Sequence, residues 1–186
     1  MLLAEKAPLE LINCEIIPAL DHVGKGYEEK TVYLPQLLMS AEAAKAAFEK
    51  IKENSAAKTD KIKCDFVLAT VFGDIHDIGK NIVKLLLENY GFSVIDLGKD
   101  VPPEKIADEV VKKHAPLCGL SALMTTTVPA MEKTVALIKR LAPWCKVAVG
   151  GAVLTKEYAD RMGADKYAKD AMETVRYAEK IYKELG

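Results

Sequence analysis

Residues 73–81 carry the side chains whose types and spacing best suit chemistry, in the order Gly-Asp-Ile-His-Asp-Ile-Gly-Lys-Asn. An imidazole that binds a metal through one nitrogen is usually held at its other N–H by a carboxylate or a carbonyl. Asp74 lies two residues before His76, and in an extended segment side chains at this spacing share a side. Gly79 would let a bulky ligand approach the backbone. The pattern therefore indicates a metal ligand at His76.

Two other kinds of site are excluded. A Walker-type phosphate loop has four residues between its glycines and a Ser or Thr after its Lys. Here five residues separate Gly73 from Gly79, and Asn81 stands where the hydroxyl residue would be. A phosphoacceptor site of the response-regulator kind needs a carboxylate at the end of the third strand. This chain has Ser-Ala-Leu-Met-Thr there, at 121–125.

A plain interpretation of the loop histidine also exists, in which it is solvated or caps a helix. The residues alone leave this alternative open. The chain has three histidines, at positions 22, 76 and 114, and no cysteine pair close in sequence. A self-contained zinc site is therefore not expected. If His76 binds a metal, the other ligands must come from a cofactor.

Residues 1–54 have the pattern of helices alone. An apolar stripe at helical spacing runs over residues 8–24, and Gly24 and Gly26 are expected to end this helix. A second helix is predicted over residues 34–51, with a proline in its favoured first turn. Two such helices cannot bury both of their faces alone, so they should pack on something else.

The rest of the chain, residues 63–186, follows a polar linker at 55–62 and alternates strands with helices. This rhythm predicts an α/β domain with a parallel sheet covered on both faces. For five strands the default is a flavodoxin-like order, with the ligand crevice at the carboxyl ends of strands one and three. The predicted strands are 66–72, 93–97, 117–123, 147–149 and 166–168, and the predicted helices are 81–90, 103–114, 129–141, 156–162 and 171–185.

Composition narrows the classes of function. The net charge is -1 and no block of like charge stands out, so there is no electrostatic case for nucleic acid or an anionic membrane as partner. The longest apolar runs are strand-sized, far too short to span a bilayer, and the N-terminus lacks the layout of a signal peptide. Four cysteines are scattered without a CxxC pair, which favours a reduced, cytoplasmic protein without disulfides.

The loop at 73–83 resembles the corrinoid-binding module of cobalamin-dependent methionine synthase and of stand-alone corrinoid methyltransferase proteins. Asp74, His76 and Gly79 match the D-x-H-x-x-G signature of B12-binding domains. The similarity covers nearly the whole chain, and its several ordered motifs make it specific. The further matches are the S-x-L motif near the end of strand three at 121–123, the Gly-Gly pair after strand four at 150–151, and the closing segment at 163–171.

This resemblance implies a cobalamin cofactor, methylcobalamin or a related corrinoid. His76 would be the lower axial ligand of cobalt, in place of the dimethylbenzimidazole base, which enters a slot in the α/β domain with its nucleotide tail. Asp74 would hydrogen-bond His76, and Thr127 would continue the relay. Ser121 and Thr125 would contact the buried base. The positions carried over as cofactor-binding in the α/β domain are Gly73, Asp74, Ile75, His76, Asp77, Ile78, Gly79, Ser121, Leu123, Thr125, Thr127, Gly150, Gly151 and Ala171.

Plain structural roles remain open for several of these positions. Leu123 could belong to the core. Thr127 could cap the helix that begins near residue 129. Gly150 and Gly151 could form only a turn between a strand and a loop.

The helical half resembles the cap that shields the upper face of cobalt in methyl-carrying members of the family. Tyr27, Leu34 and Leu37 would be the shielding side chains. An apolar lid would keep water away from a reactive centre. The alternative is that these residues only pack the two helices on each other. The earliest helical segments of the family's cap look absent, so we expect a short, truncated cap.

The resemblance predicts a methyl carrier, either a piece of methionine synthase or a stand-alone corrinoid protein, and not a complete catalyst alone. Its expected partners are the methyltransferase proteins or domains that load and unload the methyl group, together with a reductive activation partner. Two alternatives stay open. The small subunit of an adenosylcobalamin mutase shares the loop but normally lacks the cap. A cobalamin-dependent sensor joins such a cap to a DNA-binding head, which is not evident here.

Overall fold

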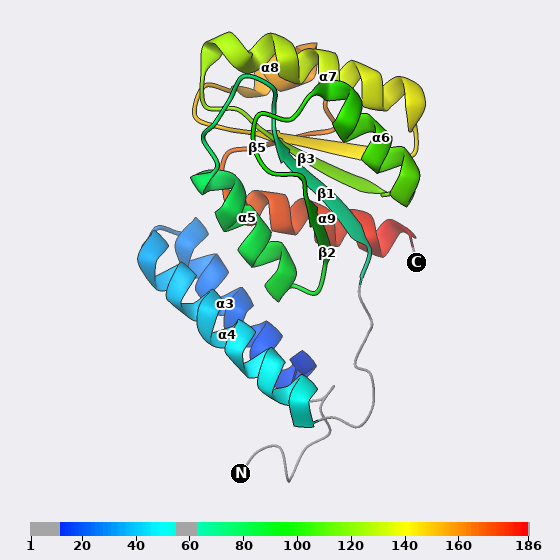
Figure 1. Ribbon diagram of the computed structural model, residues 1–186. Coiled ribbons are helices and arrows are strands. Elements are labelled where there is room, and N and C mark those ends of the chain that lie inside the picture. Colours follow the sequence, from blue (N-terminus) through cyan, green and yellow to red (C-terminus); the bar gives the residue numbers. More distant parts are fainter. Residues whose placement is uncertain (1–11, 55–62, 186) are drawn as a thin grey trace. The chain divides into compact units, whose positions relative to one another are not determined.

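A computed structural model describes residues 12–54 and 63–185 of the chain (Figure 1). The molecule divides into two compact units, Met1–Lys61 and Ile62–Gly186. The predicted linker at 55–62, and the first part of the helix predicted from residue 8, lie outside the described residues.

The described part of the first unit consists of helices joined by a turn at residues 29–33, as its sequence pattern predicts. Helices α3 and α4 pack on each other, and α4 buries Leu37, Ala41 and Ala44, a stripe at helical spacing. The elements are the π-helical turn η1 (Ile12–Ile16), α3 (Ile17–Glu28) and α4 (Leu34–Asn54).

The prediction that Gly24 and Gly26 end the first helix is wrong, because α3 continues to Glu28. Gly26 instead allows a close approach of the chain that returns toward α4. Its carbonyl oxygen accepts hydrogen bonds from the backbone N–H of Thr31 (2.8 Å) and of Val32 (3.0 Å). A Cβ atom on Gly26 would lie 2.7 Å from Cγ2 of Val32. The glycine is therefore explained by packing space and not by helix termination.

The second unit is an α/β domain whose five parallel strands run in the order β2-β1-β3-β4-β5. This is the predicted flavodoxin-like order, and that prediction is confirmed. Strands and helices alternate along the chain: β1 (Asp65–Thr70), α5 (Ile78–Asn89), β2 (Ser93–Asp96), α6 (Pro103–Lys113), β3 (Leu117–Ser121), the 3₁₀ turn η2 (Thr125–Thr127), α7 (Val128–Leu141), β4 (Lys146–Gly150), α8 (Lys156–Arg161), β5 (Lys166–Ala168) and α9 (Ala171–Leu185).

Helices cover both faces of this sheet, with α6, α7 and α8 on one face and α5 and α9 on the other (Figure 1). The main hydrophobic core lies on the α6–α8 face, where every second strand residue points. Its buried members include Val67, Ala69, Cys118, Leu120, Val147 and Val149 from the strands, and Ile106, Val110, Met131, Val135, Ile138, Ala159 and Met162 from the helices. Cys118 packs here as a small apolar residue, as predicted.

The α5–α9 face of the sheet differs because the residues on β3, β4 and β5 are small. Alternation along the strands puts Gly119, Ala148, Gly150 and Ala168 on this face. A Cβ atom on Gly119 would lie 2.8 Å from side-chain atoms of neighbouring β1 residues. Small residues over three adjacent strands leave unfilled space between the sheet and the helices α5 and α9.

Two boundaries beside the predicted ligand crevice differ from the sequence prediction. The strand predicted to reach Leu123 ends at Ser121, and the helix predicted from residue 81 begins at Ile78. Beyond Ser121 the backbone N–H groups of Leu123 and Met124 donate to a side chain of another loop. Because those donors are used there, they are not available to continue a β-ladder.

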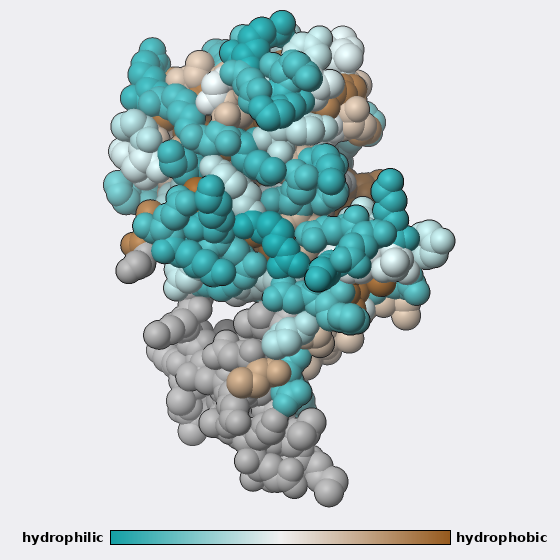
Figure 2. Space-filling view, turned by 180° about the vertical axis from the view of Figure 1, so that it is seen from behind, coloured by the Kyte–Doolittle hydropathy of each residue, from teal (hydrophilic) through white to brown (hydrophobic). Residues whose placement is uncertain are grey.

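The face of the α/β unit that is turned away in Figure 1 is largely hydrophilic, with scattered apolar side chains (Figure 2). Within residues 12–54 and 63–185, no helix combines the length and apolarity needed to cross a membrane. All four cysteines are free thiols, Cys14 exposed, Cys64 partly buried, and Cys118 and Cys145 buried.

Candidate functional site

The loop after β1 is fixed by hydrogen bonds to the ends of β1 and β3 and to the loop after β2. The backbone N–H of Val71 donates to the carbonyl oxygen of Ser121 at the end of β3 (3.1 Å). The hydroxyl of Thr70, the last residue of β1, donates to the carbonyl oxygen of His76 (3.1 Å). The backbone N–H of Gly73, whose φ is +82°, donates to Oδ1 of Asp100 (2.7 Å). The loop is therefore held in one shape at the carboxyl ends of the strands, where α/β sheets bind ligands.

The Asp74 carboxylate is fully buried and is surrounded by hydrogen-bond donors. Its Oδ1 accepts from the backbone N–H of His76 (3.0 Å) and lies 2.8 Å from His76 Nδ1. Its Oδ2 accepts from the backbone N–H groups of Leu123 (2.6 Å) and Met124 (3.3 Å) and from the hydroxyl of Thr127 (3.1 Å). One carboxylate thus ties the β1 loop to the β3 loop and to the 3₁₀ turn η2.

These donors also set the charge of the Asp74 side chain. Burial alone would raise its pKa. The hydrogen bonds from His76, Leu123 and Thr127 outweigh burial and lower the pKa from 3.8 to about 2. The side chain is therefore ionised at neutral pH. An ionised carboxylate 2.8 Å from His76 Nδ1 favours the tautomer that carries its proton on Nδ1, which leaves the lone pair of Nε2 free.

The other ring nitrogen of His76, Nε2, makes no hydrogen bond to the described residues, and the side chain is 46% exposed. No group of three or more His, Cys, Asp or Glu suited to a metal occurs among residues 12–54 and 63–185. A metal bound at His76 would therefore need its other ligands from outside the described residues. Large apolar side chains are exposed around His76: Phe72 and Ile75 in the same loop, Ile78 at the start of α5, and Leu123 in the loop after β3. They provide an apolar surface for a large planar group.

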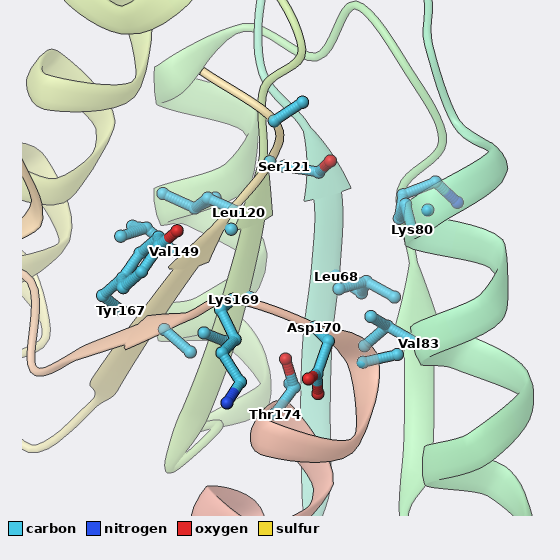
Figure 3. A pocket seen from close by; sticks show the side chains of 18 residues that line it. Leu68, Lys80, Val83, Leu120, Ser121, Val149, Tyr167, Lys169, Asp170 and Thr174 are labelled. Atoms are coloured by element: carbon cyan, nitrogen blue, oxygen red, sulfur yellow. The ribbon is translucent and has the colours of Figure 1, made fainter. Parts of the chain in front are cut away.

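A cavity of about 430 Å³ lies between the sheet and the helices α5 and α9 (Figure 3). It occupies the space left by the small residues on β3, β4 and β5. Figure 3 places Ser121 and Lys80 toward one end of the cavity and Asp170 and Thr174 toward the other. The cavity and the His76 loop share the first turn of α5, because Gly79 and Lys80 line the cavity. One ligand with a large head and a narrow tail could therefore contact both.

Glycines open this cavity at its edge. Gly151 has φ +139°, and a Cβ atom there would lie 1.7 Å from the carbonyl oxygen of Ala122. Nothing lies within 4 Å of the position of a Cβ atom on Gly79, so the backbone at the start of α5 is open to a ligand. The residues present thus fit a bulky group over the loop with an appendage in the cavity.

The structure brings the predicted site residues together in two places. Asp74, His76 and Thr127 form the hydrogen-bonded cluster in the loops. The cavity is lined by five of the predicted positions, namely Gly79, Ser121, Gly150, Gly151 and Ala171. Gly73 and Asp77 lie in the loop itself, where Asp77 is the residue before α5 and makes no side-chain cap.

Several sequence interpretations require correction. Leu123 is 41% exposed, so the alternative core role is wrong, and its backbone N–H is the part that contributes to the cluster. Thr127 makes no side-chain cap on α7, so the capping alternative is also wrong. Thr125 is exposed on η2 and does not line the cavity. Its predicted contact with a buried base has no support in this geometry.

The three predicted shielding residues of the helical unit differ in exposure. Leu37 is buried as part of the α4 stripe, at 1% exposure, which favours the packing alternative for this residue. Tyr27 and Leu34 are partly buried. Shielding by these two stays a prediction.

Sequence reasoning missed Lys80, whose side chain is almost fully buried beside the cavity. Its Nζ donates to Asp96 Oδ1 (2.6 Å) and to Asn81 Oδ1 (2.8 Å). Burial would raise the pKa of Asp96, but this hydrogen bond and the one from Gly98 lower it. The ion pair fastens the first turn of α5 to the end of β2. The sequence around Lys80 did not indicate this ion pair, because its partner Asp96 lies on β2, 16 positions further along the chain.

The cavity residues on the strands had a readable signal that was also missed. In β3 and β4, small residues occupy every second position toward the strand ends, as Gly119 and Ser121 in β3 and their partners Ala148 and Gly150 in β4. Such alternation on two neighbouring strands of a covered sheet indicates one face without core side chains. It would have predicted a slot on that face.

Comparisons with known proteins agree with this geometry. A model of the B12 binding domain matches residues 65–176, and a second B12 binding domain model matches residues 1–52. Dimethylamine corrinoid protein 1 of Methanosarcina acetivorans is 37% identical over 180 residues, which are 95% of this chain and 84% of the relative. Trimethylamine corrinoid protein 1 of Methanosarcina mazei is 36% identical over 172 residues, which are 90% of this chain and 80% of the relative.

Two solved structures resemble the chain over most of its length. The methanol:cobalamin methyltransferase complex MtaBC of Methanosarcina barkeri matches with a TM-score of 0.84 and 33% identity, over 98% of this chain and 70% of that chain. A cobalamin-binding protein of Desulfitobacterium hafniense matches with a TM-score of 0.80 and 32% identity, over 93% and 82%. The chain therefore belongs to the B12-binding domain family, and its cofactor is a corrinoid of the cobalamin type.

Proposed function

We propose that this chain carries a methyl group on a bound corrinoid between methyltransferase partners, with His76 as the residue that would hold the cobalt. The observation that carries the proposal is the state of His76: its Nδ1 is held 2.8 Å from a buried carboxylate, and its Nε2 is left without a partner among the described residues. The relatives support the carrier role, because they are methylamine corrinoid proteins and a protein of a methanol:cobalamin methyltransferase complex.

The bound corrinoid would supply a cobalt ion that accepts a methyl group from one partner and gives it up to another. The residues of the chain would control the lower side of that cobalt. Asp74 orients the imidazole and keeps its proton on Nδ1, so that Nε2 presents a lone pair. When Nε2 is not used as a ligand, the same nitrogen is a proton acceptor. Thr127 donates to the other carboxylate oxygen and would extend the relay from His76 through Asp74.

The surrounding surface would exclude water from this contact. Phe72, Ile75 and Ile78 are 52%, 63% and 78% exposed, values that leave large apolar surfaces to be covered by a ligand. A corrinoid over the loop would cover part of them. Their burial would add hydrophobic affinity to the single metal–nitrogen bond.

The helical unit would act as the cap of the bound corrinoid. A B12 binding domain model matches residues 1–52, which supports a role of the helical unit in corrinoid binding. We propose a cap over residues 1–54, a linker at 55–62 and the corrinoid-binding domain over 63–186. The cap favours a methyl carrier over a mutase small subunit, which normally lacks one. A reductive activation partner and a cytoplasmic location are part of the same proposal, and the free thiols fit a reducing compartment.

The carrier role can be tested in an extract of the cells that make this protein, after the protein has been removed. Labelled methylamines and methanol would be offered as donors, with a thiol as acceptor. Methyl transfer is expected only after the corrinoid-loaded chain is added back, and chain without corrinoid is the matched control. Equal transfer with and without the loaded chain for every donor would refute the proposal, even if the chain binds a corrinoid.

A further inference from the structure

Asp100, in the loop between β2 and α6, has a backbone conformation that residues with a side chain rarely adopt. Its φ is +54°, in the left-handed region where glycine is the usual residue. Aspartate tolerates this region better than most residues do, but it still costs free energy. A glycine at this position would avoid that cost, so the aspartate side chain is expected to contribute something that glycine cannot.

That contribution is a pair of hydrogen bonds to the start of the His76 loop. Oδ1 of Asp100 accepts from the backbone N–H of Gly73 (2.7 Å), and the backbone N–H of Asp100 donates to the carbonyl oxygen of Asp74 (2.9 Å). Asp100 therefore fixes the backbone on both sides of the peptide bond that links Gly73 to Asp74. This peptide lies directly before the residues that carry the imidazole.

The same segment also holds the other end of the His76 loop. Oδ1 of Asp96, the last residue of β2, accepts from Nζ of Lys80 (2.6 Å) in the first turn of α5 and from the backbone N–H of Gly98 (2.9 Å). Residues 96–100 thus contact the loop before His76 through one carboxylate and after His76 through another. We call these five residues the clasp.

The clasp is itself tied to the sheet at the end of β1. The backbone N–H of Thr70 donates to the carbonyl oxygen of Gly98 (2.9 Å), and the backbone N–H of Val101 donates to the carbonyl oxygen of Thr70 (3.1 Å). The hydroxyl of the same threonine donates to the carbonyl oxygen of His76 (3.1 Å). The clasp therefore has a fixed base from which it can hold the loop.

We infer that Asp100 is a positioning residue for the proposed cobalt ligand, and that the clasp holds the His76 loop in its binding shape before a corrinoid arrives. The inference rests on the proposed function and adds to it a residue that acts on His76 through the loop backbone. A metal ligand loses affinity when its support can move, because ordering of the loop then opposes binding.

Three substitutions of Asp100 separate the hydrogen bond from the backbone conformation. Asp100→Asn keeps an acceptor oxygen and tolerates the left-handed region. Asp100→Gly fits that region without strain but removes the acceptor, and Asp100→Ala loses both advantages. Each variant would be loaded with methylcobalamin, and its visible spectrum would be recorded as a function of pH. The readout is the midpoint pH at which the red species with His76 on cobalt changes to the yellow species, since a proton competes with cobalt for Nε2.

The expected shift follows from the place of Asp100 behind Asp74. Partners that orient a metal-ligating imidazole commonly contribute about ten- to hundredfold in metal affinity. Asp100 acts one step further from the imidazole, so ligation in Asp100→Gly and Asp100→Ala should weaken on the order of tenfold. A weaker bond to cobalt lets the proton displace it at higher pH, so the midpoint should rise by about one pH unit. Asp100→Asn should keep the wild-type midpoint.

Asp165→Ala is the matched control. The Asp165 carboxylate also accepts a hydrogen bond from the backbone N–H of a distant residue, Val147 (2.7 Å), but near the amino end of β4. This variant should lower the stability in urea unfolding and leave the midpoint pH unchanged. An equal rise of the midpoint in Asp165→Ala and in Asp100→Gly would indicate a general loosening of the fold and would overturn the role assigned to Asp100.

A second measurement needs no cofactor. Amide hydrogen exchange of Gly73 should become faster in Asp100→Gly and Asp100→Ala than in the wild type, because its acceptor is lost. In Asp100→Asn it should stay slow. Unchanged exchange in Asp100→Gly would overturn the inference, because the hydrogen bond would then not hold the loop.

Failure of the inference and failure of the proposed function give different results. A wild type that retains no corrinoid, or that never shows His76 on cobalt, would overturn the proposed function and the inference with it. A red wild type together with a wild-type midpoint in Asp100→Gly would leave the cofactor site standing and overturn the inference alone. Should Asp100→Ala fail to fold, Asp100→Gly and Asp100→Asn still decide the outcome.

Discussion

Replacing Asp74 with asparagine should destabilise the α/β unit even without a cofactor. The drop in pKa from 3.8 to about 2 corresponds to about 2 kcal/mol in favour of the ionised side chain. Asp74→Asn loses this preference and also turns one acceptor atom into an amide donor. Every hydrogen-bonding neighbour of the carboxylate is itself a donor, so one side of the amide must face donors. The expected loss in the free energy of unfolding is about 2 to 4 kcal/mol.

The assay is urea unfolding of the cofactor-free chain at pH 7. It would be followed by the fluorescence of Trp144, the single tryptophan, which lies in the α/β unit. Asp160→Asn is the matched control: this carboxylate is 60% exposed and pairs with Lys156 at 2.6 Å. Its loss should be below about 0.5 kcal/mol. A loss for Asp74→Asn within about 0.5 kcal/mol of the control would refute the account of the buried cluster.

The same variant predicts a pH dependence with a definite sign. The pKa of Asp74 is lower in the folded protein than in the unfolded chain. Its contribution is therefore fully present above the unfolded value of 3.8 and is lost as the pH falls toward about 2. The difference in stability between wild type and Asp74→Asn should stay constant from pH 7 down to about pH 5. It should then shrink as the pH falls further.

Two more predictions concern the cavity edge and the thiols. Gly151→Ala should lower the stability of the α/β unit by more than about 3 kcal/mol, because the new Cβ atom would lie 1.7 Å from the carbonyl oxygen of Ala122. Gly163→Ala, with φ +77° but open space around it, should cost only about 1 kcal/mol in the same urea assay, and equal losses would contradict the steric argument. A thiol reagent at pH 8 should modify the exposed Cys14 quickly, whereas Cys145 should react only on unfolding, since burial raises its pKa to about 12. Rapid modification of Cys145, identified by mass spectrometry of the folded chain, would show that the core is open.

The topology and the loop chemistry could be predicted because they depend on local patterns. Alternating strand and helix segments set the five-stranded order, and the spacing of Asp74 and His76 placed both side chains together. The role of Gly26 could not be predicted, because it depends on where the chain returns after the helix ends. The sequence pattern predicts that Gly26 ends the helix, whereas in the structure its missing side chain leaves room for Val32.

Contacts between distant segments explain the remaining errors at the site. The early end of β3 follows from two backbone N–H groups that donate to Asp74, about fifty positions earlier in the chain. The ion pair of Lys80 with Asp96 joins a helix to a strand.

The loop cluster around Asp74 and the cavity contribute to the site in different ways. The loop cluster is rigid and polar, since Asp74 is fully buried and hydrogen-bonded on both oxygens. The cavity is formed by absent side chains, so its volume depends on Gly119, Gly150 and Gly151 remaining small. Changes in the cluster should therefore alter the ligation of cobalt, and changes in the cavity should alter the affinity for the tail.

The most direct test of the central claim is the visible spectrum of the chain with bound methylcobalamin, recorded for wild type and for His76→Ala after unbound cofactor has been removed. The account predicts a red species in the wild type, with the dimethylbenzimidazole base displaced and His76 on cobalt. In His76→Ala it predicts a yellow spectrum with no lower nitrogen ligand, or loss of the cofactor. Identical spectra for the two proteins would show that His76 is not the ligand, and a wild type that retains no corrinoid would contradict the assignment of the site as a whole.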